Sequence, residues 1–121
     1  MPIQTRQGAC AVILRVGAGP QSVALGARPG TPSIAHACLT MERFDRVKVM
    51  KTLAEYGVKP RGDATDPVKP LVSWVRMRGE DAGGAKGGTP ELYFTDPDGI
   101  TIQLQDVSYC GGSGILGNVC R

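Results

Sequence analysis

Hydrophobic and polar residues alternate on both sides of an Asp-Pro-Asp-Gly sequence at residues 96–99. Beyond it, Ile100, Ile102 and Leu104 alternate with polar neighbours, which is the two-residue period of a half-buried β-strand. Within it, the proline presets φ for a turn and the glycine accepts a positive φ. The pattern therefore predicts a β-hairpin over residues 91–105.

Apolar residues recur at helical spacing in one part of the chain. They share one face of the expected helix: Val47, Met50, Leu53 and Ala54. Asp45 is a residue type that caps helix N-termini, and Gly57 is a residue type at which helices end. The pattern predicts a helix over residues 45–56.

Further segments have the apolar, β-branched content of strands: residues 10–16, 21–25, 34–40 and 71–77. The first two flank a Gly-Ala-Gly-Pro breaker and are expected to form an N-terminal hairpin. Proline, glycine and charged residues predict connecting segments over residues 27–33, 59–69 and 79–90. From residue 34 to residue 105 the predicted order is strand, helix and three strands, which is an α+β arrangement.

Alternation along the strands predicts which side chains can meet. Small or apolar residues of the strand at residues 34–40 are suited to lie under the helix: Ala35, Ala37 and Leu39. His36, the only histidine in the chain, then points to the opposite side. Gln103 lies between two apolar residues of its strand and also points away from the helix. If the two strands are neighbours, the imidazole and the amide oxygen face a common point.

The same alternation places Trp74 and Arg76 on one face, and Glu91 and Tyr93 on one face. Trp74, Arg76 and Tyr93 are therefore candidate binding residues, which would stack on and orient an anionic or aromatic ligand. The alternative is an ordinary sheet surface of cross-strand charged and aromatic pairs. Glu91, beside Pro90 at the start of its strand, is expected to be exposed.

Charge and hydropathy argue against two classes of partner. The formal net charge is +3, and the basic residues are scattered instead of forming the run typical of nucleic-acid binding. The longest apolar run, residues 9–14, is far shorter than the ~18 residues that span a bilayer, and it lacks the flanks of a signal peptide. We therefore expect a cytoplasmic protein with no nucleic-acid or membrane partner.

The cysteines are Cys10, Cys38, Cys110 and Cys120. None forms a Cys-x-x-Cys pair, so neither a zinc knuckle nor a redox pair is indicated, and reduced thiols are expected. Cys110 and Cys120 flank a glycine-rich segment that would let them bond in an oxidising compartment. Whether they form a disulfide stays open at this point.

The order of the elements, the histidine in the first strand and the sequence Phe-Thr-Asp-Pro-Asp-Gly-Ile-Thr-Ile-Gln at residues 94–103 resemble the vicinal oxygen chelate superfamily. This superfamily includes glyoxalases, ring-cleaving dioxygenases, fosfomycin-modifying enzymes and bleomycin-resistance proteins. The resemblance covers residues 34–105 and implies a βαβββ module whose mixed, curved sheet forms a cleft around a divalent metal. It places His36 at the position of the first-strand metal ligand and Gln103 where a glutamate usually lies. The ion would be zinc, nickel, manganese or iron.

The chain departs from the family pattern in two ways. Gln103 offers a neutral carbonyl oxygen instead of a carboxylate, which weakens binding of a divalent ion and weighs most against an iron dioxygenase site. Residues 10–25 resemble only the closing strands of a first module, so the chain is either a fragment of a longer protein or a homodimer that shares its clefts. The implied divisions are a partial module at residues 1–30, a βαβββ module at residues 31–107 and a glycine-rich tail at residues 108–121.

The resemblance implies a glyoxalase-like or dioxygenase-like enzyme, a metal-dependent lyase or dioxygenase, in which a metal on His36 and Gln103 polarises vicinal oxygens of a small substrate. No other catalytic residue is indicated, and whether the chain is an enzyme stays open. One alternative is a metal-free module, similar to the bleomycin-resistance proteins, with Trp74 and Tyr93 as walls for a small-molecule ligand. Another is a truncated remnant without activity. For the two residues themselves, the alternatives are a partly buried, hydrogen-bonded histidine and a glutamine on a solvated strand face.

Overall fold

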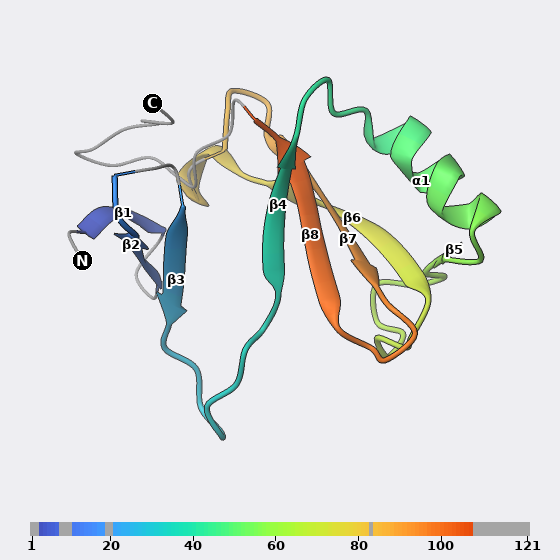
Figure 1. The fold of residues 1–121 in the computed structure, drawn as a ribbon, viewed down its shortest axis with the longest axis horizontal. Coiled ribbons are helices and arrows are strands. Elements are labelled where there is room, and N and C mark those ends of the chain that lie inside the picture. Colours follow the sequence, from blue (N-terminus) through green and yellow to red (C-terminus); the bar gives the residue numbers. More distant parts are fainter. Residues whose placement is uncertain (1–2, 8–10, 19–20, 83, 108–121) are drawn as a thin grey trace. The chain divides into compact units, whose positions relative to one another are not determined.

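The computed structural model describes residues 3–7, 11–18, 21–82 and 84–107 of the chain (Figure 1). The predicted tail at residues 108–121 and the cysteines at positions 10, 110 and 120 lie outside the described residues. The chain divides into two compact units, and each has its own sheet. Among the described residues, no helix is long and apolar enough to cross a membrane.

The first unit contains a three-stranded antiparallel sheet in the order β1-β2-β3. Its strands are β1 (Ile3–Gln7), β2 (Ala11–Arg15) and β3 (Ser22–Gly26). The last two confirm the predicted N-terminal hairpin, whereas the pattern gave no indication of β1. A short 3-10 helix, η1 (Glu80–Ala82), also belongs to this unit.

The second unit contains a five-stranded mixed sheet in the order β4-β8-β7-β6-β5, with one helix. Its elements are β4 (Ala37–Met41), α1 (Arg46–Glu55), β5 (Lys59–Pro60), β6 (Val72–Arg78), β7 (Thr89–Thr95) and β8 (Thr101–Asp106). β4 is parallel to β8, β7 is antiparallel to β8, and β5 is parallel to β6. The predicted α+β class with an open, mixed sheet is confirmed (Figure 1).

Local chemistry explains the two elements that the sequence predicted most directly. The Asp45 side chain accepts hydrogen bonds from the backbone N–H groups of Val47 and Lys48 at 2.9 and 3.1 Å, so it caps α1 as expected. In the β7–β8 turn the Asp96 carboxylate accepts from the backbone N–H groups of Asp98 and Ile100. Gly99 has φ of 81°, which is the conformation that this turn requires of it.

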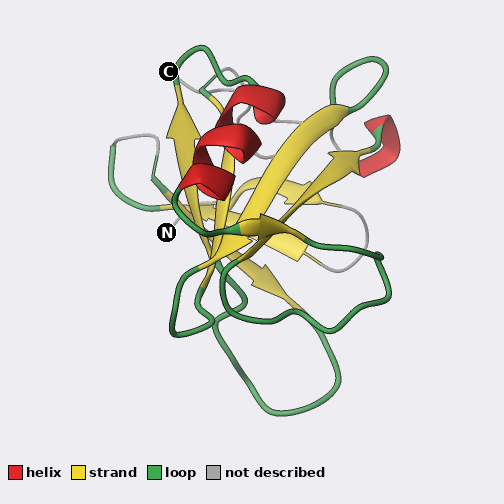
Figure 2. Ribbon diagram, turned by 90° about the vertical axis from the view of Figure 1, so that its right-hand side faces the viewer, coloured by secondary structure: helices red, strands yellow, loops and turns green. Residues whose placement is uncertain are grey.

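The helix covers less of the sheet than the alternation predicted. α1 lies over one face of the sheet (Figure 2) and against β5, at the edge opposite β4 (Figure 1). Leu39 of β4, expected under the helix, is therefore 56% exposed. No residue of α1 is fully buried, Val47 is 70% exposed and Ala54 is also exposed, so the predicted apolar face was wrong for these two residues. The half-buried residues of α1 are Val49, Met50 and Leu53.

Candidate functional site

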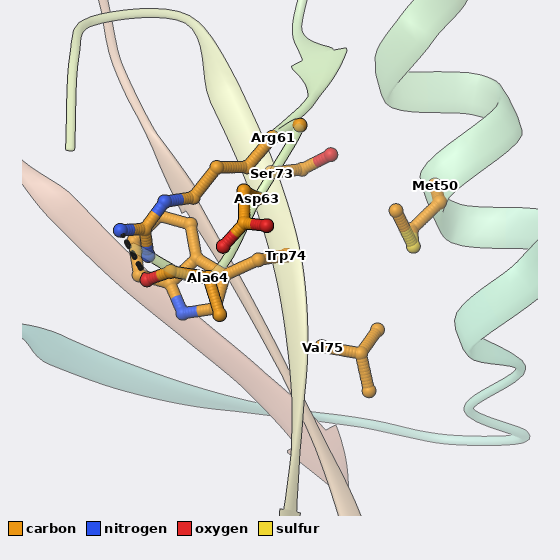
Figure 3. A pocket seen from close by; sticks show the side chains of 8 residues that line it. Met50, Arg61, Asp63, Ala64, Ser73, Trp74 and Val75 are labelled. Carbon is orange, nitrogen blue, oxygen red and sulfur yellow. Dashed lines mark hydrogen bonds between the residues drawn. The ribbon is translucent and has the colours of Figure 1, made fainter. Parts of the chain in front are cut away.

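The candidate residues lie on the face of the five-stranded sheet that is opposite α1, which we call the far face. Ser73 and Val75 of β6 project toward α1 and Met50, whereas Trp74 projects the other way (Figure 3). Residues that are paired across neighbouring strands project from the same face of a sheet. Tyr93 of β7, Gln103 of β8 and Cys38 of β4 are paired in this way and therefore share one face.

Three rings and one guanidinium follow one another on the far face and form what we call the ring row: His36, Tyr93, Trp74 and Arg61. The Trp74 and Tyr93 rings are stacked, with centroids 5.4 Å apart and planes 9° apart. The His36 ring meets the Tyr93 ring edge-on at 5.5 Å, and the Arg61 guanidinium lies 5.6 Å from the centre of the Trp74 ring. Each such aromatic pair stabilises the fold by about 0.5–1.5 kcal/mol in addition to the contribution of its buried area. The rings of the row are therefore fixed relative to one another.

His36 occupies the exposed end of this row. It precedes β4, and β8 lies between β4 and β7 in the sheet, so its ring must cross over β8 to reach Tyr93. His36 and Gln103 are thus on the same face, as the alternation predicted. The predicted strand over residues 34–40 was wrong at its start, because β4 begins at Ala37 and His36 lies just before it. The alternative of a partly buried histidine inside a sheet is also wrong, because His36 is exposed.

A buried polar quartet, Glu91, Tyr93, Gln103 and Gln105, lies beside the row. The Tyr93 hydroxyl donates to the Glu91 carboxylate at 3.1 Å, and the Gln103 amide N–H donates to the Gln105 amide oxygen at 2.9 Å. Their exposed fractions are 0% for Glu91, 7% for Tyr93, 3% for Gln103 and 7% for Gln105. Buried polar groups are normally hydrogen-bonded, and these two pairs meet that requirement.

Two expectations about these residues were wrong. Glu91 is buried instead of exposed, because β7 begins at Thr89 and places Glu91 inside the strand instead of at its start. The alternative for Gln103, a solvated strand face, is also wrong, because the side chain is buried and bonded to Gln105. Sequence alternation gave the faces of both residues correctly but contained no information about what covers them.

The described residues of one chain do not fit a complete divalent-metal site. Among them, no group of three or more histidine, cysteine, aspartate and glutamate side chains could hold a metal ion. The Gln103 amide is engaged with Gln105, and the His36 ring packs on Tyr93. A two-ligand site on His36 and Gln103 therefore stays a prediction.

Arg76 lies on the same face of β6 as Trp74 by alternation, and its side chain is exposed. No hydrogen bond or ion pair joins its guanidinium to the described residues. It stands apart from the ring row as a solvent-facing cation, which is the state in which an arginine can bind an anion.

Arg61 is the member of the row that the sequence did not indicate, because residues 59–69 were expected to form only a loop. β5 pairs with the start of β6, and Arg61 follows it directly, so its side chain is carried over Trp74. Its guanidinium donates to the backbone carbonyls of Ala64, at 2.8 Å, and of Asp66. The sequence gave no signal for this strand, and only the β5–β6 pairing places Arg61 over Trp74.

A hollow of about 290 Å³ opens at this edge of the sheet (Figure 3). Its lining residues are Met50, Arg61, Gly62, Asp63, Ala64, Ser73, Trp74 and Val75. The backbone N–H of Thr65, at 2.9 Å, and then the Thr65 hydroxyl, at 2.8 Å, lower the pKa of Asp63 below its ordinary value by bonding its carboxylate. The hollow therefore has one cation and one anion at its rim.

Comparisons of this chain with protein-family models, with curated proteins and with solved structures found no match. What the protein does must therefore follow from the chemistry of its residues.

Proposed function

We propose that the second unit is a metal-free ligand-binding module of the vicinal oxygen chelate type, which holds a flat, anionic or aromatic small molecule against the far face. The observation that carries this proposal is the ring row, which runs without interruption from His36 through Tyr93 and Trp74 to Arg61. Rings that are already packed lose little conformational freedom when a ligand stacks on them.

Access and charge support this class of ligand. The middle of the row is buried at Tyr93, so a ligand would reach it from the exposed ring of His36 or from the half-buried ring of Trp74. Arg76 lies on the same face of β6 as Trp74 and would bind the anionic group of the ligand. The hydrogen bonds of the buried polar quartet hold the side chains of Tyr93 and Gln103 in place on this face.

A second candidate function is the metalloenzyme, a glyoxalase-like or dioxygenase-like protein of the cytoplasm. The position of the His36 ring over β8, on the face that carries Gln103, favours it. Because the described residues of one chain supply too few ligands, two copies would have to share the site as a homodimer. A bound ion would polarise two neighbouring oxygens of the substrate.

Metal analysis and ligand binding separate these two functions. We expect protein purified without chelator to contain no stoichiometric divalent metal, and benzoate to bind with the same affinity before and after chelator treatment. Trp74→Ala should weaken benzoate binding by about tenfold or more in calorimetry, since base-like stacking on an aromatic side chain contributes about 1–3 kcal/mol. Trp74→Phe, which keeps a ring, is the matched control.

The opposite result has equally clear signs. Stoichiometric metal in the wild-type protein that disappears in His36→Ala, together with a dimer in solution, would establish the metal site and reject the metal-free module. Benzoate binding that Trp74→Ala leaves unchanged would remove the ring row as the binding surface.

A further inference from the structure

The crevice between α1 and β6 is chemically different from the far face. It is the α1 side of the hollow at the sheet edge, and Met50 and Val75 form its walls (Figure 3). Both side chains are only half-buried, and no residue of α1 is fully buried. The helix therefore leaves part of β6 incompletely covered.

Ser73 lies in this crevice, and its hydroxyl is unusual. The residue is 0% exposed, and its Oγ atom makes no hydrogen bond. Figure 3 shows the side chain projecting to the α1 side of β6, the side on which Met50 and Val75 also lie. A buried hydroxyl without a partner costs about 1–3 kcal/mol, so a serine here is unfavourable unless something bonds to it.

A second unpartnered donor lines the same hollow. The Nε atom of Arg61 is buried and makes no hydrogen bond, although the Nη2 atom of the same guanidinium bonds two backbone carbonyls. The Arg61 guanidinium lies over the Trp74 ring, which explains why its Nε atom is buried. This explanation does not apply to Ser73, whose neighbours on the α1 side of the hollow are apolar.

We propose that the α1–β6 crevice is a binding site for a small, neutral, apolar molecule that carries one carbonyl oxygen, which accepts a hydrogen bond from the Ser73 hydroxyl. The apolar walls at Met50 and Val75 bind the hydrocarbon part. The whole hollow, of which the crevice is the α1 side, has a volume of about 290 Å³, so the crevice suits a molecule of single-ring size at most. A neutral ligand is favoured because the Asp63 carboxylate at the rim opposes a second anion, while the Arg61 guanidinium is already engaged with backbone carbonyls.

This site lies on the other side of the sheet from the rings of the ring row, although Arg61 and Trp74 also line the hollow. Ser73 and Trp74 are neighbours in β6 and point to opposite faces of the sheet. The hydrogen bond to Ser73 is therefore made on the α1 side, and Ser73→Ala tests it separately from the test of the ring row by Trp74→Ala.

Cyclohexanone is a suitable probe, because it combines one carbonyl oxygen with an apolar ring. Titration of the full chain, followed through backbone amide chemical shifts, should perturb α1 and β6 and leave β8 unchanged. Ser73→Ala should raise the Kd by about three- to tenfold, the factor expected for one hydrogen bond. Thr52→Val, on α1 but outside the hollow, should leave the Kd unchanged, and cyclohexanecarboxylate should bind more weakly than cyclohexanone.

Ser73→Ala also has an effect that a merely structural serine would not show. Without ligand, this variant should have a Tm higher by about 4 °C or more, because it removes an unpartnered buried hydroxyl. A stabilised protein with weakened cyclohexanone binding supports the site. The proposal is overturned if saturating cyclohexanone leaves α1 and β6 unperturbed, if Ser73→Ala binds it as well as the wild type does, if the carboxylate binds more tightly, or if Ser73→Ala lowers the Tm.

Discussion

The two faces of the five-stranded sheet differ in whether their buried polar side chains are hydrogen-bonded. On the far face, the hydroxyl of Tyr93 and the amide of Gln103 each have a partner on their own strand. On the α1 face, the hydroxyl of Ser73 has none, although the residue is equally buried. The hydroxyl of Tyr93 and the amide of Gln103 are thus paired within the far face, whereas the α1 face contains an unmet hydrogen bond at Ser73, where the helix covers the sheet only in part. An unmet buried hydrogen bond requires an explanation, and the proposed ligand of the α1–β6 crevice would supply one.

The largest expected effect concerns the middle of the α1 face. Leu92 is 0% exposed, and Leu92→Ala should lower the free energy of unfolding by about 2–5 kcal/mol, through lost burial and the cavity left behind. Leu39→Ala, at the edge strand with 56% exposure, should cost roughly 1 kcal/mol or less. Denaturant unfolding measures both, and equal costs would contradict the limited reach of α1.

An intermediate effect tests the polar quartet. Gln105→Ala removes the acceptor of the Gln103 amide N–H and should lower the free energy of unfolding by about 1–3 kcal/mol, since a buried donor is left without a partner. Its sign is opposite to the one expected for Ser73→Ala. Gln21→Ala, at an exposed position, is the matched control and should change stability by roughly 0.5 kcal/mol or less. A stability gain in Gln105→Ala would remove the contrast between the two faces.

The smallest effect concerns the rim of the hollow. The pKa of Asp63 is held below its ordinary value, so its ionised form stabilises the fold above that ordinary value, and the contribution is lost as the pH falls through the lowered pKa. Thr65→Ala removes the hydroxyl and keeps the backbone N–H, so the pKa should rise part of the way back. Titration of the Asp63 carboxyl carbon by NMR measures this shift. Thr40→Ala should leave it unchanged, and an unaltered pKa in Thr65→Ala would exclude the hydroxyl as a cause.

Short-range chemistry made the helix and the final hairpin of the second unit predictable, whereas β5 lies in residues that were expected to form only a loop. The cap at Asp45 and the turn glycine at position 99 act within a few residues of themselves, so the sequence alone was enough to find the helix and the final hairpin. The faces of Trp74, Tyr93 and Gln103 were equally predictable, because the two-residue period of a strand does not depend on its neighbours. The division of the chain at residues 1–30, 31–107 and 108–121 and the family resemblance stay predictions.

Contacts between segments that are far apart in the chain could not be predicted from the sequence. Nothing near Glu91 indicates its burial, and nothing near Arg61 indicates that β5 carries it over Trp74. The order of strands in the sheet decides both, together with the edge at which α1 lies.

The sequence by itself determined the α+β class, the ends of the helix, the final turn and the side of the sheet on which each candidate residue lies. Only the tertiary structure decided that the rings form one row, that Gln103 is bonded to Gln105 and that Ser73 is buried without a partner. The reason is physical: capping, turn geometry and strand alternation are local interactions, whereas burial and side-chain pairing depend on segments far apart in the chain.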